Sequence, residues 1–317
     1  MREVKALSLV ILMILLFFIA STSCSTKDGI TNPELPVSDQ PVPGIDIVTL
    51  PIAVHVIHFG EVIGEGTNLS EKRIHRQIEI LNEDFRRIKN TRGHNNHPNG
   101  ADTKIQFALA KQNLKGELSN GINRIFQNSD SVENLGYNQN HFAQYVYWNP
   151  EEVINIWVTP LPKEAECLVL GSSSGPETDL PGTEYLSIPG PNDAEGILIN
   201  WTHFGESEIN CHARFGRTLT HEMGHYLGLL HLWGSKECET NDFIEDTPAV
   251  EREVFGNNKF SGCDGEEVQI ENYMNYTDDV VMNMFTVGQA ERMHYVLKNH
   301  PGRNSLISSH ALETPEF

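Results

Sequence analysis

The sequence predicts an α+β fold, with a twisted mixed sheet and two long helices, followed by an irregular C-terminal subdomain with a closing helix. Three observations lead to this prediction. Apolar runs of strand length recur between residues 50 and 204, amphipathic helical stretches interrupt and follow them, and Gly, Asn, Asp and Pro become frequent beyond residue 231. The chain of 317 residues is long enough to bury a sizeable core in one large domain or two small ones.

Residues 1–23 have the features of an export signal of the lipoprotein type. A short basic segment precedes an apolar run that is too short to span a bilayer comfortably, and small residues then lead to Cys24. This stretch resembles a bacterial lipobox, so we expect an acylated Cys24; ordinary signal-peptidase cleavage and a retained N-terminal anchor are the alternatives. The polar, Pro-rich segment 24–47 is predicted to be a flexible tether.

The ordered domain is predicted for residues 48–303, with an N-terminal subdomain 48–228, a C-terminal subdomain 229–303 and a tail at 304–317. Apolar residues of segment 68–89 repeat at helical spacing, with Asn68 or Ser70 as the N-cap. A second helix is expected at residues 215–227 and the closing helix at 287–299. Strands are expected at residues 50–59, 104–110, 153–160, 184–188 and 196–204.

The chain is acidic, with 43 Asp and Glu against 23 Lys and Arg, a formal net charge of −20. Nucleic acid and anionic membrane surfaces repel such a chain, so we expect contact with a membrane only through a lipid anchor. Thirteen of the acidic residues lie between Glu237 and Asp279, where only Arg252 and Lys259 oppose them. This stretch is either a solvated loop or a cation site of the calcium type.

Four cysteines remain if Cys24 is acylated, and an even number in an exported protein indicates disulfide bonds. Four cysteines allow three pairings, of which sequence proximity favours Cys167–Cys211 and Cys238–Cys263. A zymogen in which Cys24 or Cys211 blocks a metal is another arrangement that the sequence leaves open.

The stretch from His221 to His231, HEMGHYLGLLH, contains three histidines and one glutamate. His221 and His225 are four residues apart and therefore share one face of a helix. Gly228 can adopt a positive φ, which allows the helix to end and the chain to return His231 toward the other two. Three neutral imidazoles with an open fourth position are typical of a catalytic zinc site.

Glu222 lies next to this predicted metal site without needing to bind the metal. A zinc-bound water has a pKa near ~7, and Glu222 would accept its proton and later deliver it to a leaving amine. The extended pattern HExxHxxGxxH is the signature of metzincin metallopeptidases, in which a methionine turn lies under the metal. Residues 272–276, NYMNY, supply that turn, with Met274 as the apolar floor.

Several further segments of the chain resemble the pappalysin family of metzincins, on its ulilysin- and cytophagalysin-like branch. The resemblance covers roughly residues 50–300 and includes AVHVIH at 53–58, ILNEDFRR at 80–87, LTHEMGHYLGL at 219–229, DTPA at 246–249, YTDD at 276–279 and FTVGQAERM at 285–293. It implies zinc at the three histidines, Glu222 as the general base and Tyr276 as the group that stabilises the oxyanion.

The resemblance also implies calcium in the loop after the third histidine, where Asp242, Asp246 and Thr247 are the candidate ligands. It places the segment of Asp279 beside the pocket for the side chain that follows the scissile bond, where a carboxylate would pair with Arg or Lys. The alternatives for Asp279 are a solvated turn residue or another calcium ligand. Relatives often carry a cysteine shortly after the methionine turn, where this chain has Val280 and Val281.

We therefore interpret the sequence as an exported, lipid-anchored or secreted zinc endopeptidase that acts on proteins or peptides. A catalytically silent surface binding protein of the same fold is the main alternative, and a zinc aminopeptidase or other exopeptidase is a third. The remaining histidines receive no role. Among them, His55 and His58 are predicted to be structural, and His94, His97 and His212 are predicted to lie in loops.

Overall fold

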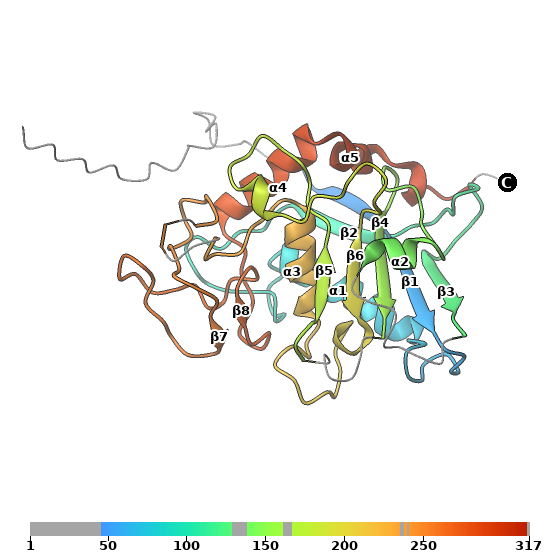
Figure 1. Cartoon of the computed structure of the whole chain (residues 1–317), viewed down its shortest axis with the longest axis horizontal. Coiled ribbons are helices and arrows are strands. Elements are labelled where there is room, and N and C mark those ends of the chain that lie inside the picture. Colours follow the sequence, from blue (N-terminus) through green and yellow to red (C-terminus); the bar gives the residue numbers. More distant parts are fainter. Residues whose placement is uncertain (1–45, 129–137, 161–166, 235–237, 240, 316–317) are drawn as a thin grey trace, which may run out of the picture. The chain divides into compact units, whose positions relative to one another are not determined.

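The computed structural model describes residues 46–128, 138–160, 167–234, 238–239 and 241–315. The predicted export signal, Cys24 and nearly all of the tether lie outside the described residues. The described residues form a mixed sheet with helices packed on it and a long irregular segment before the last helices (Figure 1). In these same ranges, no helix combines the length and apolar character that a membrane crossing needs.

The sheet is built around β1 (Val48–His58). Its first half pairs with β2 (Ile105–Leu109) and its second half with β3 (Ile122–Phe126), both in parallel. On its other side follow β4 (Ile154–Thr159) and β6 (Ile197–Asn200), also parallel. The edge strand β5 (Gly171–Ser173) runs antiparallel to β6, so the predicted mixed sheet is confirmed.

The two faces of the sheet bury different sets of side chains. Helices α1 (Glu71–Phe85) and α3 (Arg217–Tyr226) pack with alternate strand residues such as Val54 and Ile156 in the main core. The intervening residues point to the other face, where α2 (Gln139–Ala143) contributes to a smaller cluster around Trp157. Helix α3 thus lies against the sheet beside its edge strand β5 (Figure 1).

Helix α1 is shorter than the predicted segment 68–89. It begins after Ser70, whose hydroxyl accepts a hydrogen bond from the Arg73 amide, and it ends at Phe85. Arg87 and Asn90 then take positive φ angles of 49° and 66°, which are incompatible with a continuing helix. The apolar spacing continues past this point in the sequence, but the backbone turns away.

The strand predicted at residues 184–188 is wrong. Gly182 has a φ of 81°, and the chain enters a 3₁₀ helix, Thr183–Tyr185, instead of an extended run. The strand predicted at residues 196–204 is half right, because Asn200 ends β6 by accepting a hydrogen bond from the Thr202 amide and starts a 3₁₀ turn. The short elements β3, β5 and α2 were not predicted.

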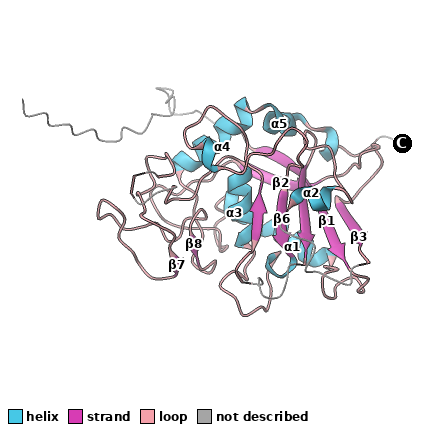
Figure 2. Ribbon diagram, viewed as in Figure 1, coloured by secondary structure: helices cyan, strands magenta, loops and turns pink. Residues whose placement is uncertain are grey.

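The C-terminal part is mostly irregular, as Figure 2 shows, with one small parallel pair, β7 (Phe255–Gly256) and β8 (Tyr276–Thr277). The closing helix α4 (Val287–Asn299) begins and ends where the sequence predicts, with a capping box between Thr286 and Gln289. A short helix α5 (Pro301–Asn304) and two 3₁₀ turns follow, and they bury Leu306 and Ala311.

Two disulfide bonds join distant loops. Cys167 is bonded to Cys211 and Cys238 to Cys263, the pairing that sequence proximity favours. The bond to Cys167 excludes Cys211 as a thiol that could block a metal. Disulfide bonds of this kind persist in oxidising compartments, in agreement with an exported protein.

Candidate active site and metal centre

The first two histidines are presented by α3, which a buried ion pair fixes against α1. The Arg217 guanidinium donates to Asp84 at 3.1 Å, and the Thr220 hydroxyl donates to the same carboxylate at 2.7 Å. Both charged side chains are fully buried. A buried, paired contact of this type fixes the rotation of the helix, and thereby the direction in which His221 and His225 point.

Three imidazole nitrogens converge at the end of this helix. The Nε2 atoms of His221 and His225 are 3.1 Å apart, and the Nε2 of His231 lies 3.2 Å and 3.0 Å from them. Helix α3 ends at Tyr226, and Gly228 has a φ of 90° that turns the chain back. The turn is therefore the device that brings the third histidine to the site, as its spacing predicts.

The rear nitrogens of two imidazoles contact backbone carbonyls. The Nδ1 of His221 lies 2.6 Å from the Tyr273 oxygen, and the Nδ1 of His225 lies 2.8 Å from the Leu229 oxygen. An Nδ1–H that donates to a carbonyl leaves Nε2 as a lone pair that faces the centre. Burial lowers the pKa of His221 to about 3 and that of His225 to about 4, so both rings are neutral, the form that binds metals.

This donor set fits a zinc ion. In the tautomer that their carbonyl contacts favour, His221 and His225 turn Nε2 lone pairs toward the same centre as His231, and lone pairs at this distance repel each other unless a cation lies among them. Three imidazoles with a vacant coordination position match catalytic zinc in donor type and number. Among the described residues, these three histidines form the cluster whose ligand atoms approach closely enough to share a metal.

Glu222 is buried beside the imidazoles and lines the cavities on both sides of them. Burial raises the pKa of Glu222 to about 8 in the metal-free protein. A divalent cation at the neighbouring imidazoles would favour the carboxylate form. Glu222 is therefore close to the site without belonging to the histidine cluster.

Met274 lies under the histidine helix and is fully buried. A Cβ atom placed on Gly224 would come within 2.5 Å of the Met274 sulfur, so the side chain packs directly on the helix backbone between His221 and His225. The amide of Met274 donates to the Asn272 side chain at 3.0 Å, which holds the turn in place. The absence of a side chain at Gly224 therefore makes room for Met274 of the methionine turn.

An aromatic group surrounds the third histidine. The Trp233 ring stacks on His231 at 4.3 Å with an interplanar angle of 10°, and Tyr276 meets both rings edge-on at 4.8 Å. Burial, followed by the charge of Glu222, raises the pKa of Tyr276 to about 12. The phenol therefore keeps its proton and is a hydrogen-bond donor. Trp233 is a contact that the sequence analysis missed, although it follows His231 by two residues.

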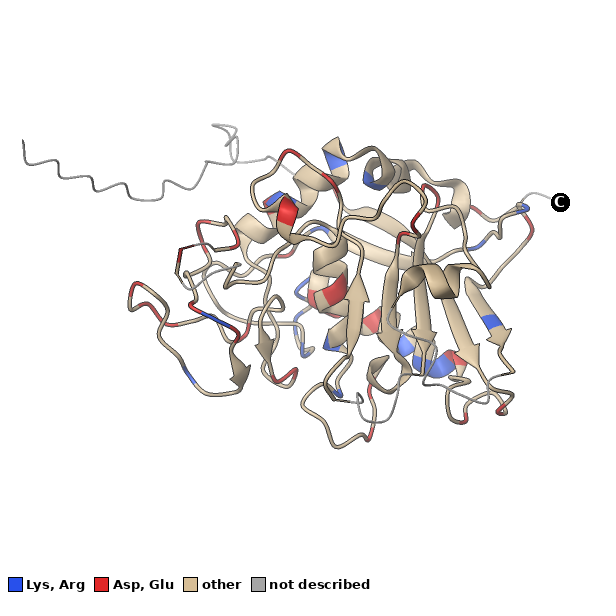
Figure 3. Ribbon diagram, viewed as in Figure 1, with Lys and Arg blue, Asp and Glu red and all other residues tan. Residues whose placement is uncertain are grey.

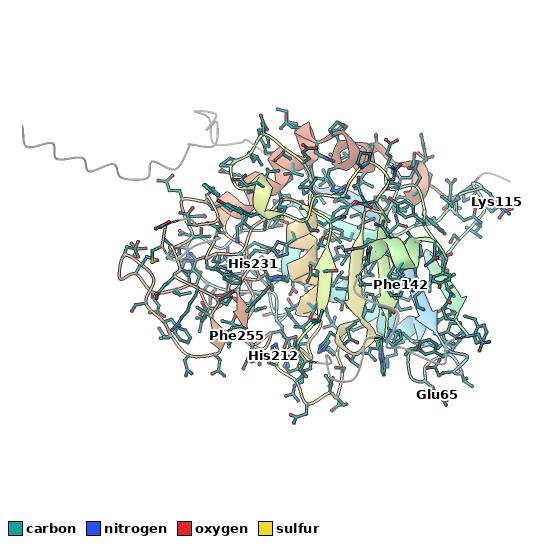
Figure 4. The ribbon with its side chains drawn as sticks, viewed as in Figure 1. Glu65, Lys115, Phe142, His212, His231 and Phe255 are labelled. Atoms are coloured by element: carbon teal, nitrogen blue, oxygen red, sulfur yellow. A yellow bond between two sulfur atoms is a disulfide. The ribbon has the colours of Figure 1, made fainter. Side chains whose placement is uncertain are left out.

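Two cavities open on either side of Glu222. The first, of about 440 Å³, lies between the segments of Leu168 and His212 and reaches Phe255 and Asp279. The second, of about 280 Å³, is bordered by β5 and by residues 185–187. Figure 4 shows Phe255 and His212 next to each other, with His231 on the same side of the molecule. His212, predicted to be a loop residue without a role, thus contributes to the wall of the first cavity.

Asp279 lines the first cavity and is 3% exposed. One carboxylate oxygen accepts a hydrogen bond from the Phe215 amide at 2.6 Å, and the other is buried without a partner among the described residues. Burial raises the pKa of Asp279, while the Phe215 amide and the Arg217 guanidinium lower it. The structure thus places a half-satisfied carboxylate on the cavity, and excludes the alternative of a solvated turn residue.

The acidic loop places Asp242 and Thr247 together, with Asp246 close by in the chain. The Thr247 hydroxyl donates to one Asp242 oxygen at 2.6 Å, and the second Asp242 oxygen is buried and has no partner among the described residues. Asp246 accepts from the Gly288 amide at 3.0 Å, and its other oxygen is also buried and unpartnered within the described chain. Burial raises the pKa of Asp242 to about 7. Figure 3 shows the Asp and Glu residues gathered along the loops around β7 and β8.

The histidines predicted to be structural behave differently from the zinc cluster. His55 is fully buried in β1, where its Nε2 donates to Asn155 at 2.8 Å and its Nδ1 accepts from Asn123 at 3.0 Å. The cavity-lining residues Leu168 and Phe255 were missed, because Leu168 lies in a loop and Phe255 in the two-residue strand β7, and neither segment is long enough to show periodicity. Their roles follow from packing between distant segments.

The fold and the site together are those of a zinc metallopeptidase of the metzincin class. The chain belongs to the M43 peptidase family, described as pregnancy-associated plasma protein-A, whose family model matches residues 136–298. This finding agrees with the pappalysin resemblance of the sequence.

Several similar proteins have metalloprotease names. An extracellular metalloprotease of Verticillium alfalfae is 40% identical over 267 residues, which cover 78% of this chain and 76% of that protein. One of Arthroderma benhamiae is 44% identical over 81 residues, which cover 25% of this chain and 30% of that protein. Mature mirolysin of Tannerella forsythia, solved with a cleaved peptide, matches with a TM-score of 0.69 and 29% identity over 86% of this chain and 99% of that chain.

Proposed function

We propose that this protein is an exported zinc endopeptidase that hydrolyses internal peptide bonds of proteins or peptides. The observation that carries the proposal is the meeting of three imidazole Nε2 atoms beside buried Glu222, between two cavities. The N-terminal subdomain, 48–228, contributes His221, Glu222 and His225. The C-terminal subdomain, 229–303, contributes His231, Met274 and Tyr276, so that the groove lies where the two meet.

Each residue of the site has a part in the reaction. When bound, zinc supplies a Lewis acid that polarises the scissile carbonyl and activates a water. Glu222 accepts the proton of this water and delivers it to the amine that leaves. The Tyr276 phenol, protonated at neutral pH, donates a hydrogen bond to the oxygen that gains charge. Cavities on both sides of Glu222 leave room for a chain that continues in both directions, which favours an endopeptidase over an exopeptidase.

The test is the variant Glu222→Gln with peptides blocked at both ends. We expect it to keep zinc, because Glu222 is outside the histidine cluster, and to lose nearly all hydrolysis. The control is Glu251→Gln, at an exposed position of the acidic loop. Wild-type protein that binds zinc but cleaves no protein would favour the silent binding protein. Cleavage of unblocked peptides alone would favour an exopeptidase, and an active Glu222→Gln variant would refute the general-base role.

The second part of the proposal is a preference for Arg or Lys after the scissile bond. It is supported by the unpartnered oxygen of Asp279 on the first cavity. A charge-assisted contact of about 1.5–3 kcal/mol corresponds to a preference of roughly ten- to hundred-fold. Cleavage-site profiling of wild type against Asp279→Asn tests it. An undiminished basic preference in the variant would show that Asp279 does not select the side chain.

The third part is a structural calcium ion bound by Asp242, Asp246 and Thr247. Two buried carboxylate oxygens that lack partners in the described ranges support it, because burial of an unpaired carboxylate is costly. Calcium at 100 times its Kd would stabilise the native state by about 2.7 kcal/mol. Thermal melting at fixed zinc with calcium, magnesium or EGTA is the test, with Asp242→Asn as the variant. Equal shifts with calcium and magnesium would favour a solvated loop.

The last part is export with an acylated Cys24. The two disulfide bonds and the extracellular metalloproteases among the similar proteins support export. Mass spectrometry of the mature N-terminus is the test, and we expect a lipid on Cys24 and recovery with membranes. An unmodified N-terminus beyond Cys24 in a soluble fraction would indicate a secreted protein instead.

A further inference from the structure

The first cavity, which we call the primed cavity because Asp279 lines it, has two walls that are anchored very differently. The wall at residues 211–213 is fixed to the cavity floor. The Asp279 amide donates to the His212 carbonyl at 3.1 Å, and the Ala213 carbonyl contacts Nδ1 of buried His203. This wall therefore stays in register with the carboxylate that is proposed to select the substrate side chain.

The opposite wall, residues 167–170, has little support from the backbone. The Leu170 carbonyl accepts a hydrogen bond from the Asn200 amide at 2.9 Å, and β5 begins only at Gly171. No backbone hydrogen bond of residues 167–169 occurs within the described part of the chain. Leu168, which lines the cavity, is nevertheless 82% exposed. Within the described residues, no backbone hydrogen bond therefore holds Leu168 over the cavity.

The Cys167–Cys211 disulfide is a covalent link between the two walls. It joins the first residue of the weak wall to the first residue of the fixed wall, across 44 residues of sequence. Leu168 follows Cys167 directly, and Phe255, which is 62% exposed, lines the same cavity. The apolar side chains of the cavity, Leu168 and Phe255, are therefore accessible, whereas its carboxylate, Asp279, is buried.

We propose that the Cys167–Cys211 disulfide determines substrate specificity by fixing the Leu168 wall over the primed cavity. Held in this way, Leu168 contacts the aliphatic stem of a long side chain that follows the scissile bond. Because the wall is already ordered, no ordering cost falls on the bound substrate. The inference rests on the proposed endopeptidase function and assigns a role that is independent of zinc binding and of Glu222.

Removal of the bridge should reduce the preference for long side chains. Without the bridge, the Leu168 wall must be ordered at each binding event. The ratio of kcat/KM for a long side chain to that for a short one should then fall by roughly three- to tenfold. The effect should appear in kcat/KM for long side chains, while cleavage before alanine changes little. Zinc content should stay at one ion per chain, because the bridge does not contact the three histidines.

The experiment compares Cys167→Ser/Cys211→Ser with wild type on end-blocked peptides that carry Arg, norleucine or Ala after the scissile bond. The matched control is Cys238→Ser/Cys263→Ser, whose bridge borders neither cavity. We expect the kcat/KM ratios of the Arg peptide to the Ala peptide, and of the norleucine peptide to the Ala peptide, to fall in the first variant only. A folded, zinc-loaded first variant with unchanged ratios would overturn the proposal, as would an equal fall in the control.

A second variant keeps the proposal testable if the bridge is needed for folding. Leu168→Ala, with the disulfide intact, should lower the same two ratios, whereas Leu114→Ala, at an exposed position away from the primed cavity, should not. Unchanged ratios in Leu168→Ala would overturn the proposal. Failure of the proposed function is distinguishable, because wild-type protein would then cleave none of the blocked peptides.

Discussion

The sheet half and the loop-rich half of this molecule provide hydrogen bonds for their buried polar groups in different ways. In the sheet, β1 pairs with three parallel strands, and the apolar side chains are free to fill the core. Around the methionine turn, the backbone pairing is reduced to the bridge of Asn272 with Met284 and the short β7–β8 pair, and buried polar side chains supply further hydrogen bonds. Asn272 contacts Gln269, Gln289 and the Met274 amide, and the Thr277 hydroxyl donates to the Ile270 carbonyl at 2.6 Å.

This difference shows that an irregular segment can be held in one conformation as firmly as a strand. Asn272 and Gln289 are fully buried, and the side-chain amide nitrogen and oxygen of each have a hydrogen-bond partner. A buried polar network fixes one geometry because any other geometry leaves groups unsatisfied. The site uses both kinds of region: a helix held on the sheet presents two histidines, and a polar network positions Met274 beneath them.

The largest expected effect is therefore in the loop-rich half. Asn272→Ala leaves the Gln289 amide and the Met274 N–H without their partner. Since each unsatisfied buried group costs about 1–3 kcal/mol, we expect the free energy of unfolding to fall by about 4 kcal/mol. Urea denaturation at fixed zinc measures it. A loss below about 1 kcal/mol would show that the network does not hold this half.

The second prediction concerns the sheet half at acid pH. Burial lowers the pKa of His55 from 6.5 to about 4, although its contact with Asn155 opposes the shift. Between these values the unfolded chain binds the proton and the folded chain does not, so stability present above pH 6.5 is lost as the pH falls toward 4. The loss amounts to about 3 kcal/mol.

Stability measured from pH 7 to pH 4 in wild type, His55→Gln and the surface control His75→Gln tests this. His55→Gln should show a shallower acid dependence than wild type, and His75→Gln should not. Identical slopes for wild type and His55→Gln would mean that His55 takes up its proton in the folded state.

The third prediction joins the two halves. In Gly224→Ala the new methyl group would meet the Met274 sulfur, and overpacking of this kind costs about 1–3 kcal/mol. Because the contact lies between His221 and His225, we also expect weaker zinc retention in dialysis against a chelator. Gly302→Ala is the control, since its nearest neighbour is His300 at 3.4 Å, an ordinary contact. Equal zinc retention in both variants would separate the methionine turn from the metal site.

The smallest expected effects are on surface ion pairs. Glu83 accepts from Arg76 at 2.7 Å on α1, and Glu83→Gln should cost about 0.5 kcal/mol, because solvent screens a partly exposed pair. Glu267, paired with Lys259 in the acidic loop, is largely exposed, and Glu267→Gln should leave the melting temperature unchanged. A greater loss of stability from Glu267→Gln than from Glu83→Gln would mean that surface charges stabilise this loop.

Local sequence predicted those parts of the fold whose signal is periodic. The strand at β1, the stripe of α1 and the whole of α4 follow from apolar spacing and capping residues. The end of α1 and the 3₁₀ helix at Thr183–Tyr185 did not, because positive φ angles at Arg87 and Gly182 decide them. Short strands such as β5 depend on a partner strand and carry too few residues for a pattern.

By itself, the sequence determined the chemistry of this protein: three imidazoles, a glutamate and a glycine at a spacing that allows one geometry, and a methionine turn on the expected side. The reason is that these residues act through local backbone periodicity, which spacing encodes directly. Only the tertiary structure decided what surrounds them. The cavity walls, the half-satisfied Asp279 and the stacked Trp233 arise where distant segments pack together, and sequence spacing carries no information about such contacts.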